Sequence, residues 1–68
     1  MRTIGIDPGT AILGWGVVDE QNGQLSPVEH GVLTTAAGTP QPHRLLELYT
    51  GMQALIARLA PDAAAVEE

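Results

Sequence analysis

Residues 4–10, Ile-Gly-Ile-Asp-Pro-Gly-Thr, constrain the fold of this chain more than any other stretch. Its two isoleucines alternate with other residues, as in a buried strand. Pro8 has no N–H for a sheet ladder, so we expect a strand over residues 3–7 that ends at Asp7. Gly9 then permits a turn that a residue with a Cβ would resist. The stretch predicts a carboxylate at the end of a buried strand, where it can face a metal ion or a phosphate.

A second strand is expected over residues 13–18, after a turn over residues 8–12. Its tryptophan and valines favour strands, and we expect Trp15 to pack in the core. Gly14 and Gly16 alternate with these larger residues, so one face of the strand has no side chains. Such a face lets another backbone or a ligand approach closely.

The Asn22-Gly23 pair predicts a hairpin between the second strand and a third. We interpret residues 19–26 as the polar connecting stretch and residues 27–35 as the third strand, antiparallel to the second. The first three strands then form an antiparallel meander.

A helix over about residues 42–59 is expected after a loop rich in Ala, Gly, Thr and Pro. Thr39 can cap this helix, with Pro40 in its first turn, and Pro61 ends it. Apolar residues recur at the spacing of one helix face, which predicts that Tyr49 and its neighbours on this face pack in the core. The face consists of Leu45, Leu48, Tyr49, Met52, Leu55, Ile56 and Leu59.

The last element, residues 63–66, reads Ala-Ala-Ala-Val, and by propensity alone it could be a helix. Its position favours a strand, because a helix has just ended and the chain must return to the sheet. A right-handed crossover places this strand parallel to the first and beside it. Asp7 and Glu67 then lie at the carboxyl ends of neighbouring strands, the usual place for a site in an open α/β sheet. The predicted fold class is α/β, with an antiparallel meander, a crossover helix and a parallel fourth strand in one mixed sheet.

Length and composition exclude several classes of protein. A chain of 68 residues makes at most one small domain, and without cysteine it has neither disulfides nor a thiolate zinc site. A net charge of −5 argues against a nucleic-acid surface within these residues. No apolar run is long enough to span a membrane and no signal-peptide core is present, so we expect a soluble, cytoplasmic protein with no membrane partner. Because the chain stops directly after a predicted strand, we expect residues 1–68 to be the N-terminal portion of a single larger domain.

Asp7 and Glu67 are the candidate catalytic and metal-binding residues. Mg²⁺ takes oxygen ligands, often one or two carboxylates with water and substrate phosphate. Two such ions can activate water and stabilise the leaving oxygen in phosphodiester hydrolysis. The alternative is that Asp7 only caps its turn and that Glu67 is only solvated. His30 and His43 are expected at the surface rather than as ligands, because no metal-binding spacing connects them.

The turn that starts at Asp7 has a second interpretation. Sugar kinases, actin and the heat-shock ATPases begin with a similar strand, Asp-x-Gly-Thr turn and strand. In those proteins backbone N–H groups of the turn cradle a nucleotide phosphate. This interpretation predicts ATP binding by residues 7–10.

Six motifs follow one another along the chain: Gly5-Ile6-Asp7-Pro8-Gly9-Thr10, Gly14-Trp15-Gly16-Val17, Arg44-Leu45, Tyr49-Thr50-Gly51, Pro61-Asp62 and Ala65-Val66-Glu67. In this order and spacing they resemble the N-terminal half of the RuvC-type Holliday junction resolvases. The resemblance covers essentially all of the chain. Pro8 favours this family over the sugar-kinase and actin group.

The resemblance implies an RNase H-like fold and a structure-selective nuclease, a crossover junction endodeoxyribonuclease. Such an enzyme resolves four-way DNA junctions by symmetric, Mg²⁺-dependent hydrolysis in DNA recombination and repair. It is a homodimer and works with the RuvA–RuvB branch-migration complex. A YqgF-type RNase H-like nuclease acting on RNA is the alternative within this fold, and the segment over residues 61–67 speaks against it.

The resemblance also assigns site residues. The first catalytic acid of the family matches Asp7, and the second matches Glu67 rather than Glu68. The two remaining acids of the family lie in its last helix, beyond residue 68, as does its basic DNA surface. The resemblance therefore implies that residues 1–68 alone are inactive.

Overall fold

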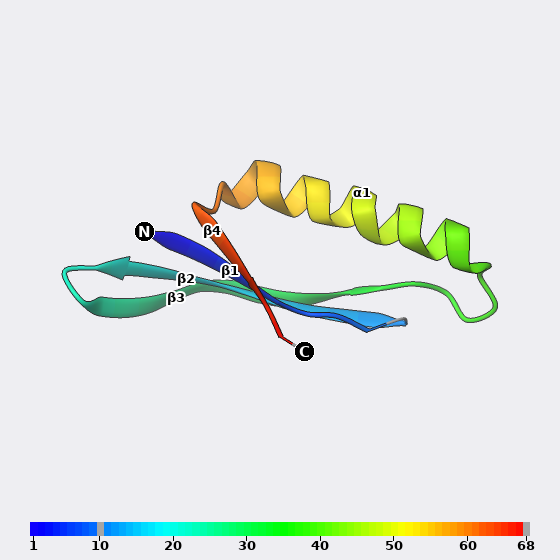
Figure 1. Cartoon of the computed structure of the whole chain (residues 1–68), viewed down its shortest axis with the longest axis horizontal. Helices are drawn as coiled ribbons and strands as arrows, with labels where there is room; N and C mark the ends of the chain where they lie inside the picture. Colours follow the sequence, from blue (N-terminus) through cyan, green and yellow to red (C-terminus); the bar gives the residue numbers. More distant parts are fainter. Residues whose placement is uncertain (10, 68) are drawn as a thin grey trace.

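The computed structural model describes residues 1–9 and 11–67. Along the chain the elements are β1 (Arg2–Asp7), β2 (Ile12–Gln21), β3 (Gln24–Thr34), α1 (Gln41–Leu59) and β4 (Ala63–Val66). The strands form one sheet in the order β3-β2-β1-β4, and α1 lies across one of its faces (Figure 1). β1 and β2 pair antiparallel, as do β2 and β3, whereas β4 runs parallel to β1. The predicted meander, crossover helix and parallel fourth strand are therefore confirmed.

The hairpin between β2 and β3 is longer than the sequence indicated. Asn22 and Gly23 form its turn, with positive φ angles of 54° and 77°. Such angles at both central residues are typical of a tight two-residue hairpin turn. The ladder continues up to the pair of Gln21 and Gln24, so the assignment of residues 19–26 to a connecting stretch was wrong. Backbone groups make the hydrogen bonds of the ladder. Polar side chains therefore do not prevent strand formation once the turn has aligned the two strands.

The helix begins differently from the prediction and ends as predicted. Its N-cap residue is Pro40, and no side chain caps it, so the prediction for Thr39 was wrong. The N–H of Thr39 instead donates to the carbonyl of Ala36 at 3.2 Å, within the preceding loop. At the other end Ala60 adopts a left-handed conformation, directly before Pro61. Within the described residues, no helix is long and apolar enough to cross a membrane.

The core lies between the second half of α1 and the sheet. Its buried members are Ile4, Val17, Leu55 and Leu59, with Ile6, Trp15, Leu33 and Met52 packed against them. Trp15 contributes to the core as predicted, and its indole ring lies over Gly31. A Cβ added at Gly31 would be only 2.9 Å from the ring, so the glycine makes room for it.

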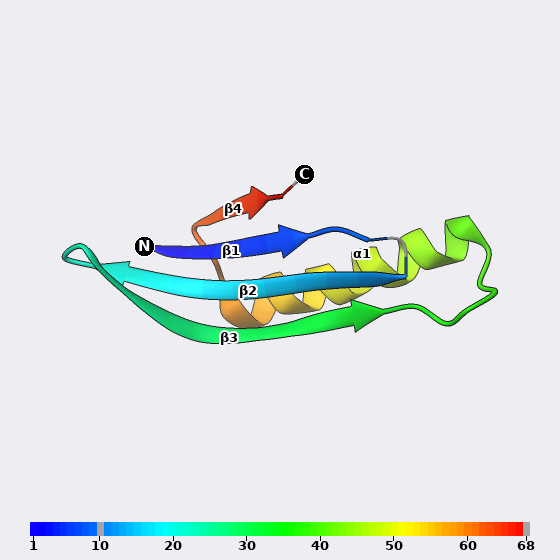
Figure 2. The ribbon, with the colours of Figure 1, turned by 90° about the horizontal axis from the view of Figure 1, so that it is seen from below.

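The apolar face of α1 is only partly buried. Tyr49 is 62% exposed and Leu45 is 59% exposed, so the prediction that they pack in the core was wrong. The first turn of α1 extends past the ends of β1 and β3 (Figure 2). Both side chains instead border an apolar hollow of about 890 Å³ beside the helix.

Candidate active site

Asp7 is the last residue of β1, and its side chain is exposed. Pro8 follows, and it cannot extend the ladder because it has no N–H. Gly9 then lies close to Ile12, since a Cβ at Gly9 would overlap the carbonyl oxygen of Ile12. The local sequence therefore fixes where the strand stops and where its terminal carboxylate is presented.

Glu67 follows β4, the strand that lies beside β1. The parallel ladder of β1 and β4 includes the pair of Ile6 with Val66. One step further, the N–H of Glu67 donates to the carbonyl of Ile6 at 2.9 Å. Glu67 consequently lies beside Asp7 at neighbouring strand ends, which is the placement that the crossover predicted.

Asp7 and Glu67 both line a hollow of about 400 Å³ on the sheet. Most of its other lining residues are glycine or alanine: Gly5, Gly14, Gly16, Gly31 and Ala65. A Cβ added at Gly14 would lie 3.8 Å from the Cβ of Asp7, so even one methyl group there would touch the acid. The small residues leave space for a ligand to approach both carboxylates closely.

No arginine lines this hollow among the described residues. Arg2 forms an ion pair with Asp19 at 2.7 Å, and Arg58 forms one with Glu29 at 2.8 Å. Arg44 borders the apolar hollow beside the helix instead. The two carboxylates therefore produce a local negative potential that attracts cations.

The donor set fits Mg²⁺. Asp7 and Glu67 supply carboxylate oxygens, and Mg²⁺ commonly takes one or two carboxylates and completes its octahedron with water and phosphate oxygens. In the part of the chain that the structure describes, no group of three or more His, Cys, Asp or Glu side chains could hold a metal ion. The remaining ligands would come from water, from substrate or from outside the described residues. Thr10 and Glu68, which the sequence places in the turn and next to Glu67, lie outside the described residues.

The two histidines lie elsewhere. His30 is exposed on β3 and His43 is exposed in the first turn of α1, and neither lines the hollow. Their placement at the surface agrees with the prediction.

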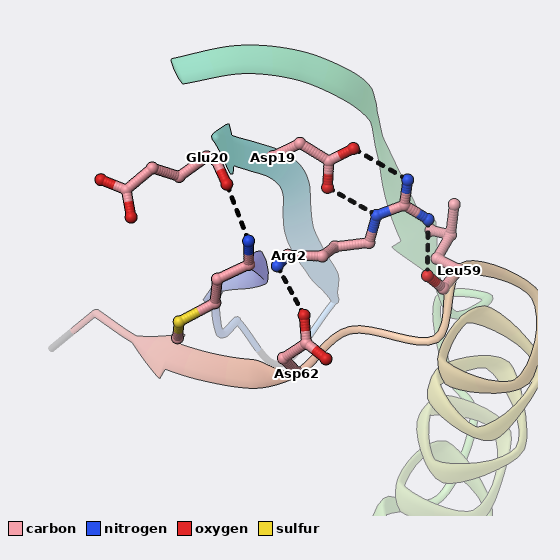
Figure 3. A network of polar contacts seen from close by, with 6 residues as sticks. Arg2, Asp19, Glu20, Leu59 and Asp62 are labelled. Carbon is pink, nitrogen blue, oxygen red and sulfur yellow. Dashed lines mark hydrogen bonds and ion pairs between the residues drawn. The ribbon is translucent and has the colours of Figure 1, made fainter. Parts of the chain in front are cut away.

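A polar network that sequence reasoning missed lies at the opposite end of β1 (Figure 3). The guanidinium of Arg2 donates to the two carboxylate oxygens of Asp19 at 2.7 and 2.9 Å and to the carbonyl of Leu59 at 2.8 Å. The backbone N–H of Arg2 donates to Oδ2 of Asp62 at 2.7 Å. Hydrogen bonding between the partners raises the pKa of Arg2 and lowers the pKa of Asp19. In the sequence Arg2 is 17 residues from Asp19 and 60 from Asp62, and the fold brings them together.

Comparison with known proteins agrees with this geometry. The sequence model of the family described as "Crossover junction endodeoxyribonuclease RuvC" matches residues 3–68. The RuvC of Chloroflexus aggregans is 63% identical over 68 residues, which are 100% of this chain and 42% of that protein. The RuvC of Brevibacillus brevis is 48% identical over 68 residues, 100% of this chain and 41% of that protein. The chain thus spans about 42% of the length of these relatives.

Solved structures show the same fold. The structure titled "T. thermophilus RuvC in complex with Holliday junction substrate" matches with a TM-score of 0.88 and 30% identity, over 100% of this chain and 44% of that chain. The PPX-GPPA enzyme of Aquifex aeolicus matches with a TM-score of 0.70 and 20% identity, over 97% of this chain and 25% of that one, and shares the fold alone. The predicted RNase H-like fold is confirmed for this chain. The family match over residues 3–68, on a fold that brings Asp7 and Glu67 together, shows that this chain belongs to the RuvC family of crossover junction endodeoxyribonucleases.

Proposed function

We propose that the whole protein resolves four-way (Holliday) DNA junctions by metal-dependent phosphodiester hydrolysis in DNA recombination and repair. In this proposal residues 1–68 are the N-terminal portion of a single nuclease domain. One observation carries the assignment to this site: the parallel pairing of β1 and β4 brings Glu67 beside Asp7 on the fold of the RuvC family. The family match supports the reaction class.

Asp7 and Glu67 are proposed to bind Mg²⁺, with two ions per site, through their carboxylate oxygens. Bound there, Mg²⁺ supplies an activated water and stabilises the charge on the leaving oxygen. The two neighbouring strand ends hold the backbones of Asp7 and Glu67 side by side. The glycine and alanine lining of the hollow lets a phosphodiester backbone approach them.

DNA binding is proposed to depend on the rest of the protein. Within the described residues, Arg2 and Arg58 already bind carboxylates, and the chain as a whole carries a net charge of −5. Phosphate contacts need clustered cations. We therefore propose that residues 1–68 alone do not cleave DNA. The proposal includes a cytoplasmic homodimer that works with the RuvA–RuvB complex, as the family resemblance implies.

The test is cleavage of a synthetic four-way junction by the full-length protein, with a linear duplex of the same sequence as control. Each substrate is incubated with Mg²⁺ and, separately, with a chelator. We expect paired, symmetric nicks in the junction only, and only with Mg²⁺. A folded dimeric protein that cleaves neither substrate would contradict the proposal, and ATP binding by residues 7–10 would then be measured.

A further inference from the structure

The side chains of β4 do little to define the register in which it pairs with β1. It consists of three alanines and a valine, and among the described residues its side chains are mostly exposed and it pairs with β1 alone. Because alanine side chains are interchangeable, packing specifies the register of such a strand only weakly. A slip of two residues would move Glu67 by about 6.6 Å along the strand and away from Asp7. Within the described residues, an interaction other than the packing of these side chains must therefore define the register.

Asp62 makes that interaction immediately before β4. Its N–H donates to the carbonyl of Arg2 at 2.7 Å, and its Oδ2 accepts a hydrogen bond from the N–H of Arg2 at 2.7 Å. Asp62 precedes Glu67 by as many residues as Arg2 precedes Asp7. Pairing at this end of the ladder consequently determines which residues meet at the other end.

Arg2 is itself held in place, as Figure 3 shows. Its guanidinium binds both carboxylate oxygens of Asp19 on β2 and the carbonyl of Leu59 at the end of α1. Only residues 60–62 connect that helix end to β4. Asp62 therefore bonds to a residue, Arg2, that is itself bonded to β2 and to α1. The start of β4 consequently has little freedom to shift along β1.

We propose that Asp62 is a positioning residue: its paired hydrogen bonds to the backbone of Arg2 set the register of β4 on β1 and so place Glu67 beside Asp7. The consequence for cleavage rests on the proposed function, whereas the register is a property of the fold. The proposal requires a hydrogen-bond acceptor at position 62 rather than a charge. Asn can supply that acceptor and Ala cannot.

The first test compares Asp62→Ala and Asp62→Asn in the full-length protein. Glu29→Ala is the matched control, because it removes an exposed carboxylate that pairs with Arg58 at 2.8 Å, away from β4. For Asp62→Ala we expect the Mg²⁺ concentration that gives half-maximal cleavage to rise about tenfold or more. Junction affinity measured in chelator is expected to stay within about twofold of wild type. Asp62→Asn and Glu29→Ala are expected to retain the wild-type Mg²⁺ requirement.

The second test reads the register without any cleavage. Thr3 pairs with Ala63, so Thr3→Cys with Ala63→Cys reports the observed register. Thr3→Cys with Ala65→Cys reports a slip of two residues. Residues 1–68 contain no cysteine, so each pair is introduced into a full-length background without other cysteines and treated with a short thiol cross-linker. We expect the first pair alone to cross-link efficiently with Asp62 present, and the second pair to cross-link at a comparable rate in the Asp62→Ala variant.

The two tests separate the two proposals. A wild-type protein that cleaves no junction contradicts the proposed function, and cross-linking then decides the register alone. If wild type cleaves, the positioning role of Asp62 is wrong when Asp62→Ala leaves either the Mg²⁺ requirement or the cross-linking pattern unchanged. It is also wrong when Asp62→Asn behaves like Asp62→Ala.

Discussion

A substitution at Asp7 can remove the charge of the side chain without changing its shape, and so test the two separately. Asp7→Asn keeps the volume of the side chain and leaves the end of β1 at Pro8, but it removes the negative charge that a cation needs. We therefore expect full-length Asp7→Asn to bind a four-way junction in chelator as wild type does and to cleave it at least about a hundredfold more slowly with Mg²⁺. Glu67→Gln is expected to behave in the same way, with Glu68→Gln as the matched control. Wild-type cleavage by Asp7→Asn would contradict the assigned role.

At the scale of elements, the ion pair of Arg2 with Asp19 ties β1 to β2 and makes their stability depend on pH. Hydrogen bonding to Arg2 lowers the pKa of Asp19 in the folded state, so the unfolded chain binds this proton more tightly. The pair stabilises the fold fully above the ordinary pKa of 3.8, and this stabilisation is lost as the pH falls through the lowered pKa. Asp19→Asn is therefore expected to reduce the free energy of unfolding at about pH 6 and to have little effect at about pH 2.

Urea denaturation of wild type and Asp19→Asn at both pH values measures how much the substitution lowers the free energy of unfolding at each pH. The exposed pair of Glu29 and Arg58 is present in both proteins and cancels in the comparison. An equal loss of stability at the two pH values would show that Asp19 acts through packing rather than through its charge.

At the scale of the whole molecule, the sheet buries only part of the apolar face of α1, and the rest of that face stays exposed. Leu45, Tyr49 and Ile56 are between 48% and 62% exposed, and a contiguous apolar surface is uncommon on a small folded protein. The chain also spans only about 42% of the length of its relatives. We expect residues 1–68 expressed alone to bind the dye ANS several-fold more strongly, per mole, than the full-length protein does. Equal dye fluorescence from the two would contradict this expectation.

Much of the fold follows from short stretches of sequence whose geometry is intrinsic. Pro8 ends β1, Asn22 and Gly23 make the turn of the hairpin, and the helix ends just before Pro61. Proline and glycine restrict or extend the backbone whatever surrounds them, so these features could be predicted. The position of Asp7 at a strand end is one of them.

Other features depend on contacts between distant segments, and only the tertiary structure decided them. Tyr49 lies on the apolar face of α1 but stays exposed beside an apolar hollow, because burial depends on how closely other elements pack against each part of the helix. Handedness of the crossover predicted that Glu67 would come near Asp7, but the register that brings them together depends on hydrogen bonds between Asp62 and Arg2. The sequence by itself determined where β1 and α1 end and where the hairpin turns, since proline and glycine act on the local backbone. The tertiary structure determined which residues meet, because sheet register and burial are properties of the assembled chain.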